Sequence, residues 1–167
     1  VDGWYEQPAL CGDTLVFASE GDLWIATLPD DGGESSPVNA HRLTSGSGVE
    51  SNPVLNADGS MVAYSASYDG NVDVYLMPTG GGAPTSLTHH PGRDVPVCFS
   101  ANGRRVAFRS ARSAPQGNPT LYTVSLGGGL PKSAGFGPCS LANFSSTGKQ
   151  IVFTPWSNET SNWKGYR

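Results

Sequence analysis

Three histidines, His41, His89 and His90, are the imidazoles that this chain of 167 residues offers for acid–base or metal chemistry. A serine or cysteine nucleophile needs such a base within hydrogen-bonding reach and is often held on a strained turn. The sequence contains no Gly-x-Ser-x-Gly elbow, and Gly46-Ser47-Gly48 is interpreted as a flexible linker. His89 and His90 are adjacent, so in an extended chain their side chains point in opposite directions. We therefore expect no catalytic residues in this segment and interpret these two histidines as loop residues.

Three residues, Asp69, Asn71 and Asp73, have the alternating spacing of a calcium-binding loop. Val74 stands where that loop needs a glycine, and Gly80 stands at the twelfth position, where a glutamate is required. The Asp-Gly-Asn stretch is instead expected to form a hairpin tip. No cysteine and histidine cluster has zinc spacing, and no glycine run opens a helix that could hold a phosphate. We expect neither a metal nor a cofactor.

Composition and charge narrow the classes of partner. The net charge of −4 and pI of about 5.2 argue against nucleic acid or anionic lipid as a main partner. The 22 glycines, the 13 prolines and the lack of a long apolar run are typical of an all-β domain and exclude a membrane span.

The cysteines and the start of the chain bear on the compartment. Cys11, Cys98 and Cys139 are interpreted as buried thiols in a reducing compartment, with a structural disulfide as the less favoured alternative. The first residues show no signal-peptide pattern and no initiator methionine. We expect a cytoplasmic protein, or a periplasmic or secreted one if a signal peptide has been removed.

The elements that position these residues follow an internal repeat. The turn glycines Gly59, Gly103 and Gly148 lie 44 and 45 residues apart. An alternating strand accompanies each copy, and its aromatic residue recurs as Phe17, Tyr64, Phe108 and Phe153. A period of this length with four strands per copy is typical of β-propeller blades. We expect the aromatic residues to be buried between blades.

We therefore predict an all-β fold, a partial β-propeller of about three and a half four-stranded antiparallel blades. Its parts are a lead-in at 1–7, blade 1 at 8–44, blade 2 at 53–88, blade 3 at 96–133, and half of blade 4 with a tail at 141–167, together one incomplete propeller domain. The first strand of each blade is expected to line the central channel. Propellers close with roughly 4–8 blades, so we expect the arc to be part of a longer propeller or to be completed by another chain.

Several segments resemble the N-terminal six-bladed propeller of tricorn protease and its homologues. They are residues 12–17 with 20–24, 68–75, 87–92 and, most specifically, 163–167 with the sequence Trp-Lys-Gly-Tyr-Arg. The turn-and-strand repeat alone is shared with TolB and with the propellers of prolyl-oligopeptidase relatives. The resemblance covers nearly the whole chain and about half of that propeller. It implies that a serine nucleophile with histidine and acidic partners lies in later domains, and that the propeller forms a passage for peptides.

Two functions follow as hypotheses. The first is a propeller segment of a tricorn-type serine peptidase, a peptide-gating and assembly scaffold without catalytic residues of its own. Its partners would be peptides and the remainder of the propeller and peptidase domains, or a second copy of the chain. The alternative is a non-enzymatic TolB-like propeller that acts as a protein-docking platform. The sequence that follows Arg167 in the gene would separate the two.

The tail supplies the candidate contact residues Trp163, Lys164, Tyr166 and Arg167. Aromatic residues and arginine concentrate binding energy at protein interfaces, so these side chains are expected to contact another domain, another subunit or a peptide. A loop packed on its own blade is an equally favoured alternative.

Overall fold

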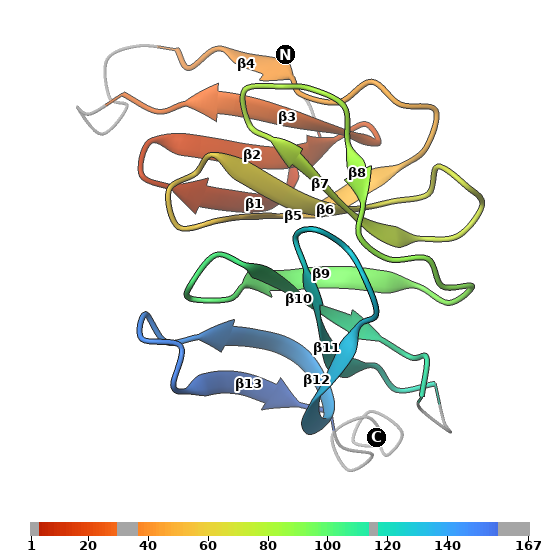
Figure 1. Ribbon diagram of the computed structural model, residues 1–167. Helices are drawn as coiled ribbons and strands as arrows, with labels where there is room; N and C mark the ends of the chain where they lie inside the picture. Colours follow the sequence, from red (N-terminus) through yellow and green to blue (C-terminus); the bar gives the residue numbers. More distant parts are fainter. Residues whose placement is uncertain (1–3, 30–36, 114–116, 157–167) are drawn as a thin grey trace, which may run out of the picture.

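The computed structural model describes residues 4–29, 37–113 and 117–156, which form strands, turns and loops (Figure 1). No helix occurs within these ranges, so none of the described residues forms a membrane-spanning helix. The strands of the described part are β1 (Glu6–Cys11), β2 (Thr14–Ser19), β3 (Asp22–Thr27), β4 (Ala40–Arg42), β5 (Glu50–Leu55), β6 (Met61–Ala66), β7 (Asp73–Pro78), β8 (Thr85–Ser86), β9 (Asp94–Phe99), β10 (Arg105–Ser110), β11 (Thr120–Ser125), β12 (Lys132–Phe144) and β13 (Ile151–Pro155). The predicted all-β class is confirmed.

The strands form antiparallel meanders in chain order. Strands β1–β4 make one four-stranded sheet, and β5–β8 make a second. Strands β9–β13 make a third sheet of five strands, in which β12 is shared between two partners. Its first half, Lys132 to Pro138, pairs with β11, and its second half, Cys139 to Phe144, pairs with β13. One continuous strand therefore runs through the interval between residues 133 and 141, which the sequence interpretation left between two blades.

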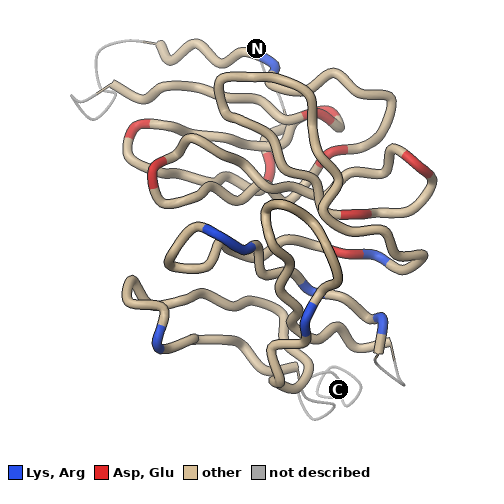
Figure 2. The backbone as a smooth tube through the Cα atoms, viewed as in Figure 1, with Lys and Arg blue, Asp and Glu red and all other residues tan. Residues whose placement is uncertain are grey.

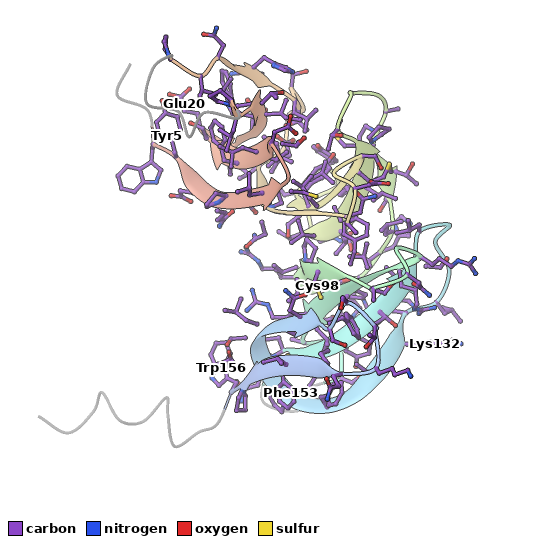
Figure 3. All side chains as sticks on the ribbon, turned by 90° about the vertical axis from the view of Figure 1, so that its left-hand side faces the viewer. Tyr5, Glu20, Cys98, Lys132, Phe153 and Trp156 are labelled. Carbon is purple, nitrogen blue, oxygen red and sulfur yellow. The ribbon has the colours of Figure 1, made fainter. Side chains whose placement is uncertain are left out.

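The sheets follow one another along the molecule as blades of an arc (Figure 1, Figure 3). The first strands of the three sheets are neighbours, with β1 beside β5 and β5 beside β9, and β12 of the third sheet also lies beside β9. This is the arrangement of a propeller, in which first strands gather around the axis. The predicted partial β-propeller is confirmed.

The core consists of layers between sheets, because successive side chains of a strand point to opposite faces. In β6, Val62 and Tyr64 pack against apolar residues of the first sheet, whereas Ala63 packs against the third sheet. In β10, Val106 faces the second sheet and Ala107 faces the layer that contains β12. A middle strand that is buried on both faces has mostly apolar residues along its whole length, and this explains the composition of Met61–Ala66.

The aromatic residues of the repeat are buried in three of the four copies. Tyr64 and Phe108 have no exposed surface, and Phe17 is also buried. Phe153 departs from the prediction because 37% of its surface is exposed. Among the described residues β13 pairs on one side alone, with β12, and the Phe153 ring contacts Phe136 at a centroid distance of 5.3 Å. Burial between blades is therefore wrong for Phe153.

The recurring turn glycines have a conformational reason. Gly59, Gly103 and Gly148 have φ values of 71°, 66° and 70°, in the left-handed region that side chains with a Cβ rarely adopt. In each turn the glycine N–H donates to a backbone carbonyl three residues earlier, at 2.8–3.1 Å. The constant spacing of these glycines in the sequence therefore reflects the same hairpin between the first two strands of successive blades.

Candidate functional site

The four residues predicted to make contacts, Trp163, Lys164, Tyr166 and Arg167, lie outside the described residues. The three histidines are described. His41 lies exposed on β4, His89 is exposed, and His90 is half-buried in the loop after β8. None of them hydrogen-bonds to a serine, threonine or cysteine side chain in the described part of the chain. Instead, the Nδ1 atom of His90 accepts the Gly92 N–H at 2.9 Å, which supports its interpretation as a loop residue.

Asp73, the last member of the calcium-like spacing, is a buried acceptor within its own blade. Its Oδ1 atom accepts the Thr88 hydroxyl at 2.9 Å and the His90 N–H at 3.1 Å, and Oδ2 accepts the Asn71 amide. In the residues that the structure describes, no group of three or more His, Cys, Asp or Glu is arranged to hold a metal ion. Asp73 therefore fixes the loop that follows the fourth strand.

The Leu-Thr pair that closes the first two repeats acquires a physical role here. The Thr44 hydroxyl accepts the Leu23 N–H at 2.8 Å, and the Thr88 hydroxyl accepts the Val74 N–H at 3.0 Å. Each threonine thus ties the segment after a fourth strand back to the third strand. Thr88 then donates to Asp73, whereas Thr44 donates to Oε2 of Glu50 at 3.0 Å. In the first blade the network therefore reaches across to the next blade.

Glu50 is the centre of the candidate site. It is the first residue of β5, and 1% of its surface is exposed. Oε2 accepts the Thr44 hydroxyl, but Oε1 is buried and no described group meets it in hydrogen-bonding geometry. Burial raises the pKa of this carboxyl, the Tyr68 and Thr44 hydroxyls oppose that rise, and the nearby Asp22 carboxylate adds to it. A buried carboxylate with one unpaired oxygen is costly and often marks a functional position.

The segment interpreted as a flexible linker lies tightly against Tyr68. A Cβ atom on Gly46 would lie 2.6 Å from Cε1 of Tyr68 and 2.9 Å from Oε1 of Glu50, and one on Gly48 would lie 2.8 Å from Cδ1 of Tyr68. A side chain at either position would force the Tyr68 ring to shift, so glycine allows this close approach. The segment connects the first two sheets, as a linker between repeats would, but it also packs against Tyr68, and a sequence cannot show which ring a loop covers.

A cleft of about 420 Å³ opens beside this loop. Gly46, Tyr64 and Tyr68 belong to its walls, together with the hydroxyls of Thr44, Ser45 and Ser47. The hydroxyl oxygens of Tyr64 and Tyr68 lie 3.2 Å apart, and the Tyr68 ring meets the Tyr75 ring edge-on at 4.7 Å between centroids. Burial raises the pKa of Tyr64 to about 12, so this phenol stays protonated and neutral. The cleft thus has aromatic and serine residues in its walls, and Gly46 separates it from the buried Glu50, which lines a second cleft of about 350 Å³.

The third blade contains a related arrangement around Asp94, the first residue of β9. Asp94 is fully buried, and its Oδ2 atom lies 2.5 Å from a guanidinium nitrogen of Arg112. The Arg112 guanidinium also lies 5.2 Å from the ring centroids of both Phe108 and Tyr122. Here the acid at the start of a first strand is neutralised by a cation that rests on aromatic rings.

Charge is divided unevenly between the blades, a feature that the sequence interpretation missed. Before His89, Arg42 is the one Lys or Arg among the described residues, while from His89 onward Asp94 is the one described acid (Figure 2). Comparing the net charge of the two halves of the sequence would have revealed this division. The Glu50 cleft therefore lies in the acidic part of the molecule.

The two ends of the arc expose apolar side chains. In Figure 3, Tyr5 lies at one end and Phe153 and Trp156 lie at the other. Beside Tyr5, a cleft of about 360 Å³ is lined by Leu15, Phe17 and Val38. On the last described hairpin, Leu141 and Val152 are exposed. Grouped apolar side chains on a surface mark contact areas for other domains or chains.

Comparison with known proteins gives a consistent result. A family model described as the tricorn protease N-terminal beta propeller domain matches residues 2–167. A relative from Sulfurisphaera tokodaii, described as a putative tricorn-like protease N-terminal subunit, is 29% identical over 99% of this chain and 82% of its own length.

Two solved structures share the fold. TolB from Acinetobacter baumannii matches with a TM-score of 0.72 and 21% identity, over 90% of this chain and 37% of TolB. Tricorn protease matches with a TM-score of 0.71 and 20% identity, over 87% of this chain and 14% of the protease. The present chain thus spans most of one relative but a small part of tricorn protease.

Proposed function

The chain belongs to the tricorn protease N-terminal β-propeller family, and from this membership we propose that it acts as a peptide-gating and assembly scaffold of a tricorn-type serine peptidase. In this proposal the chain binds and guides peptides, while the residues that cleave the peptide bond lie in other domains. The observation that carries it is the family match over residues 2–167. The histidines support it too, because none of them has a hydroxyl or thiol partner in the described structure.

The proposed partners are the remaining blades and the peptidase domains, or a second copy of the chain. The apolar ends of the arc support such partners, since exposed Leu141 and Val152 at one end and the Tyr5 cleft at the other suit further sheets. The ranges 8–44, 53–88, 96–133 and 141–167 remain our proposed division into blades.

We also propose that Trp163, Lys164, Tyr166 and Arg167 contact a neighbouring domain or a peptide. Replacing Trp163 and Arg167 by alanine in the assembled peptidase should reduce assembly or peptide turnover. The melting temperature of the propeller should change by no more than about 2 °C, because surface substitutions usually cost less than ~0.5 kcal/mol. A large loss of stability with intact assembly would instead assign these residues to packing within their own blade.

A direct test of gating uses peptides of different length. In the assembled peptidase, a bulky group attached through a disulfide to a cysteine introduced on β5, one of the first strands expected to line the channel, should slow turnover of long peptides and leave a dipeptide reporter unaffected. Adding a reductant should restore the rate. If both substrates are turned over at unchanged rates with the disulfide formed, peptides do not pass through this propeller.

A TolB-like docking platform is the alternative function. The structural similarity to TolB supports a shared fold and carries no argument for a docking role. If substitution of channel residues abolishes binding of a protein partner and leaves peptide turnover unchanged, the docking function is favoured. We propose the cytoplasm as the compartment, supported by the three free thiols of Cys11, Cys98 and Cys139.

A further inference from the structure

The second and third blades place the same parts at equivalent positions. Glu50 and Asp94 are the first residues of β5 and β9, and both are buried with one carboxylate oxygen unpaired. In register, Glu50 lies opposite Ala66 and Asp94 lies opposite Ser110, the last residues of β6 and β10. The two acids are thus equivalent by strand position, by pairing and by burial.

The residue that faces the acid differs between the two blades. Tyr68 and Arg112 each lie two residues beyond the second strand of their blade. Each packs against the aromatic residue of the third strand, Tyr68 on Tyr75 and Arg112 on Tyr122. Arg112 brings a positive charge to Asp94, but Tyr68 brings a neutral hydroxyl to Glu50. Arg42 is the one lysine or arginine among the described residues before His89, and its Nε atom lies 3.3 Å from Oδ2 of Asp22. This cation is therefore paired with another acid.

The Glu50 side lies beside an open cleft. Gly46 and Tyr68 line the cleft of about 420 Å³, and Oε1 of Glu50 lies immediately behind them. The partly exposed Tyr68 and the buried Tyr64 form aromatic walls, and the exposed Ser45 and Ser47 also line the cleft. Aromatic faces, hydroxyl acceptors and a carboxylate are the surroundings that a guanidinium group prefers.

We propose that this cleft, defined by Thr44, Gly46, Tyr64 and Tyr68 in front of Glu50, binds the guanidinium group of an arginine side chain. The bound group supplies from outside the charge that Arg112 supplies within the third blade. This inference goes beyond the proposed function, because such a site would select arginine-bearing ligands whether or not the channel passes peptides.

The test measures binding of N-acetyl-L-arginine amide to the full chain by NMR titration, with N-acetyl-L-citrulline amide as the uncharged analogue of the same shape. We expect saturable shifts at Tyr64, Tyr68 and Gly46 with a Kd in the range of about 0.1–10 mM, as suits a small ligand. At ten times the Kd, binding should lower the unfolding equilibrium constant by a factor of about 11. Citrulline amide should bind at least about tenfold more weakly.

Three variants make the result specific to this cleft. Glu50→Gln removes the charge and should abolish binding. Tyr68→Arg places a guanidinium where Arg112 lies in the next blade, so it should abolish binding and raise the melting temperature. Asp58→Asn removes one negative charge from the exposed turn before β6 and should leave the Kd within about twofold.

Absence of saturable binding to the wild-type chain would overturn the proposal, as would equal binding of the arginine and citrulline compounds. Binding that survives in folded Tyr68→Arg protein would place the ligand elsewhere. None of these outcomes bears on peptide gating, which is tested separately through turnover by the assembled peptidase.

Discussion

Tyr68 and Arg112 occupy equivalent positions in neighbouring blades, and each faces a buried acid at the start of a first strand. Arg112 lies 2.5 Å from Asp94, whereas Tyr68 packs beneath Gly46 and Gly48 beside Glu50. The repeat keeps the acid but exchanges its partner, so that Asp94 is paired with a cation whereas Glu50 is met by hydroxyl groups. The acid without a cation lies close to a cleft at the junction between the first two blades, whose walls include Gly46 and Tyr68.

Truncation of the buried aromatic residue should destabilise the protein strongly. Phe108→Ala is expected to cost about 3–5 kcal/mol, the range for removing a buried phenylalanine ring. Phe153→Ala is the matched control, because its ring is 37% exposed and should cost less than about half as much. Urea denaturation followed by tryptophan fluorescence measures both. Equal costs for the two variants would contradict the burial pattern described here.

Removal of Arg112 should expose the cost of a buried charge. Arg112→Ala leaves Asp94 without a cation, and breaking such a buried pair typically costs about 3–5 kcal/mol. The double variant Asp94→Asn/Arg112→Ala should recover part of this loss, since the uncompensated charge is gone. A double-mutant cycle by chemical denaturation gives the coupling. A loss below about 1 kcal/mol in the single variant would show that Asp94 finds water or another partner.

The stability difference between Glu50→Gln and wild type should depend on pH. Burial raises the pKa of Glu50 above its ordinary value of 4.5, so the folded state holds this proton more tightly than the unfolded state. Protonation of Glu50 therefore stabilises the folded state. This contribution is fully present below pH 4.5 and is lost as the pH rises through the folded-state pKa of Glu50. Glutamine mimics the protonated acid at every pH.

The variant should therefore gain stability relative to wild type between about pH 4 and about pH 8. Parallel urea titrations of the two proteins at both pH values measure this change. An unchanged difference would mean that Glu50 titrates normally in the folded protein.

The three cysteines should differ in reactivity. Burial raises the pKa of Cys98 to about 11 and also raises that of Cys139, and both thiols are buried. Alkylation requires the thiolate, of which about one part in a thousand is present three pH units below the pKa. Cys11 is partly exposed on β1 and should react with iodoacetamide first. Mass spectrometry of the native and the urea-unfolded protein, where all three should react, checks this order.

Much of the fold is predictable because short, local sequence features define the repeat. The glycines at 59, 103 and 148 require positive φ, and the alternating strands after them define the two faces that pack between blades. These features depend on neighbouring residues in the chain. The exposure of Phe153 depends on which strands lie beside β13, and this is not a local property.

The candidate site was harder to predict for the same reason. Thr44, Glu50 and Tyr68 meet only after two blades have packed, and no spacing rule connects them. Two signals in the sequence could have pointed to the site. One is the acid that begins successive first strands, and the other is the division of charge, with 12 of the 14 acids before His89 and nine of the ten bases after it. The glycines at 46 and 48 looked like a linker because their packing partner lies 20 or more residues away in the chain.

The central claim, that this chain is a propeller without chemistry of its own, is tested most directly by peptide turnover. The homogeneous 167-residue chain is incubated with fluorogenic peptides of varied sequence, and the rate is compared with that of buffer. The account predicts no hydrolysis above the buffer rate. Hydrolysis that co-purifies with the chain and is lost on replacement of His41, His89 or His90 would contradict it.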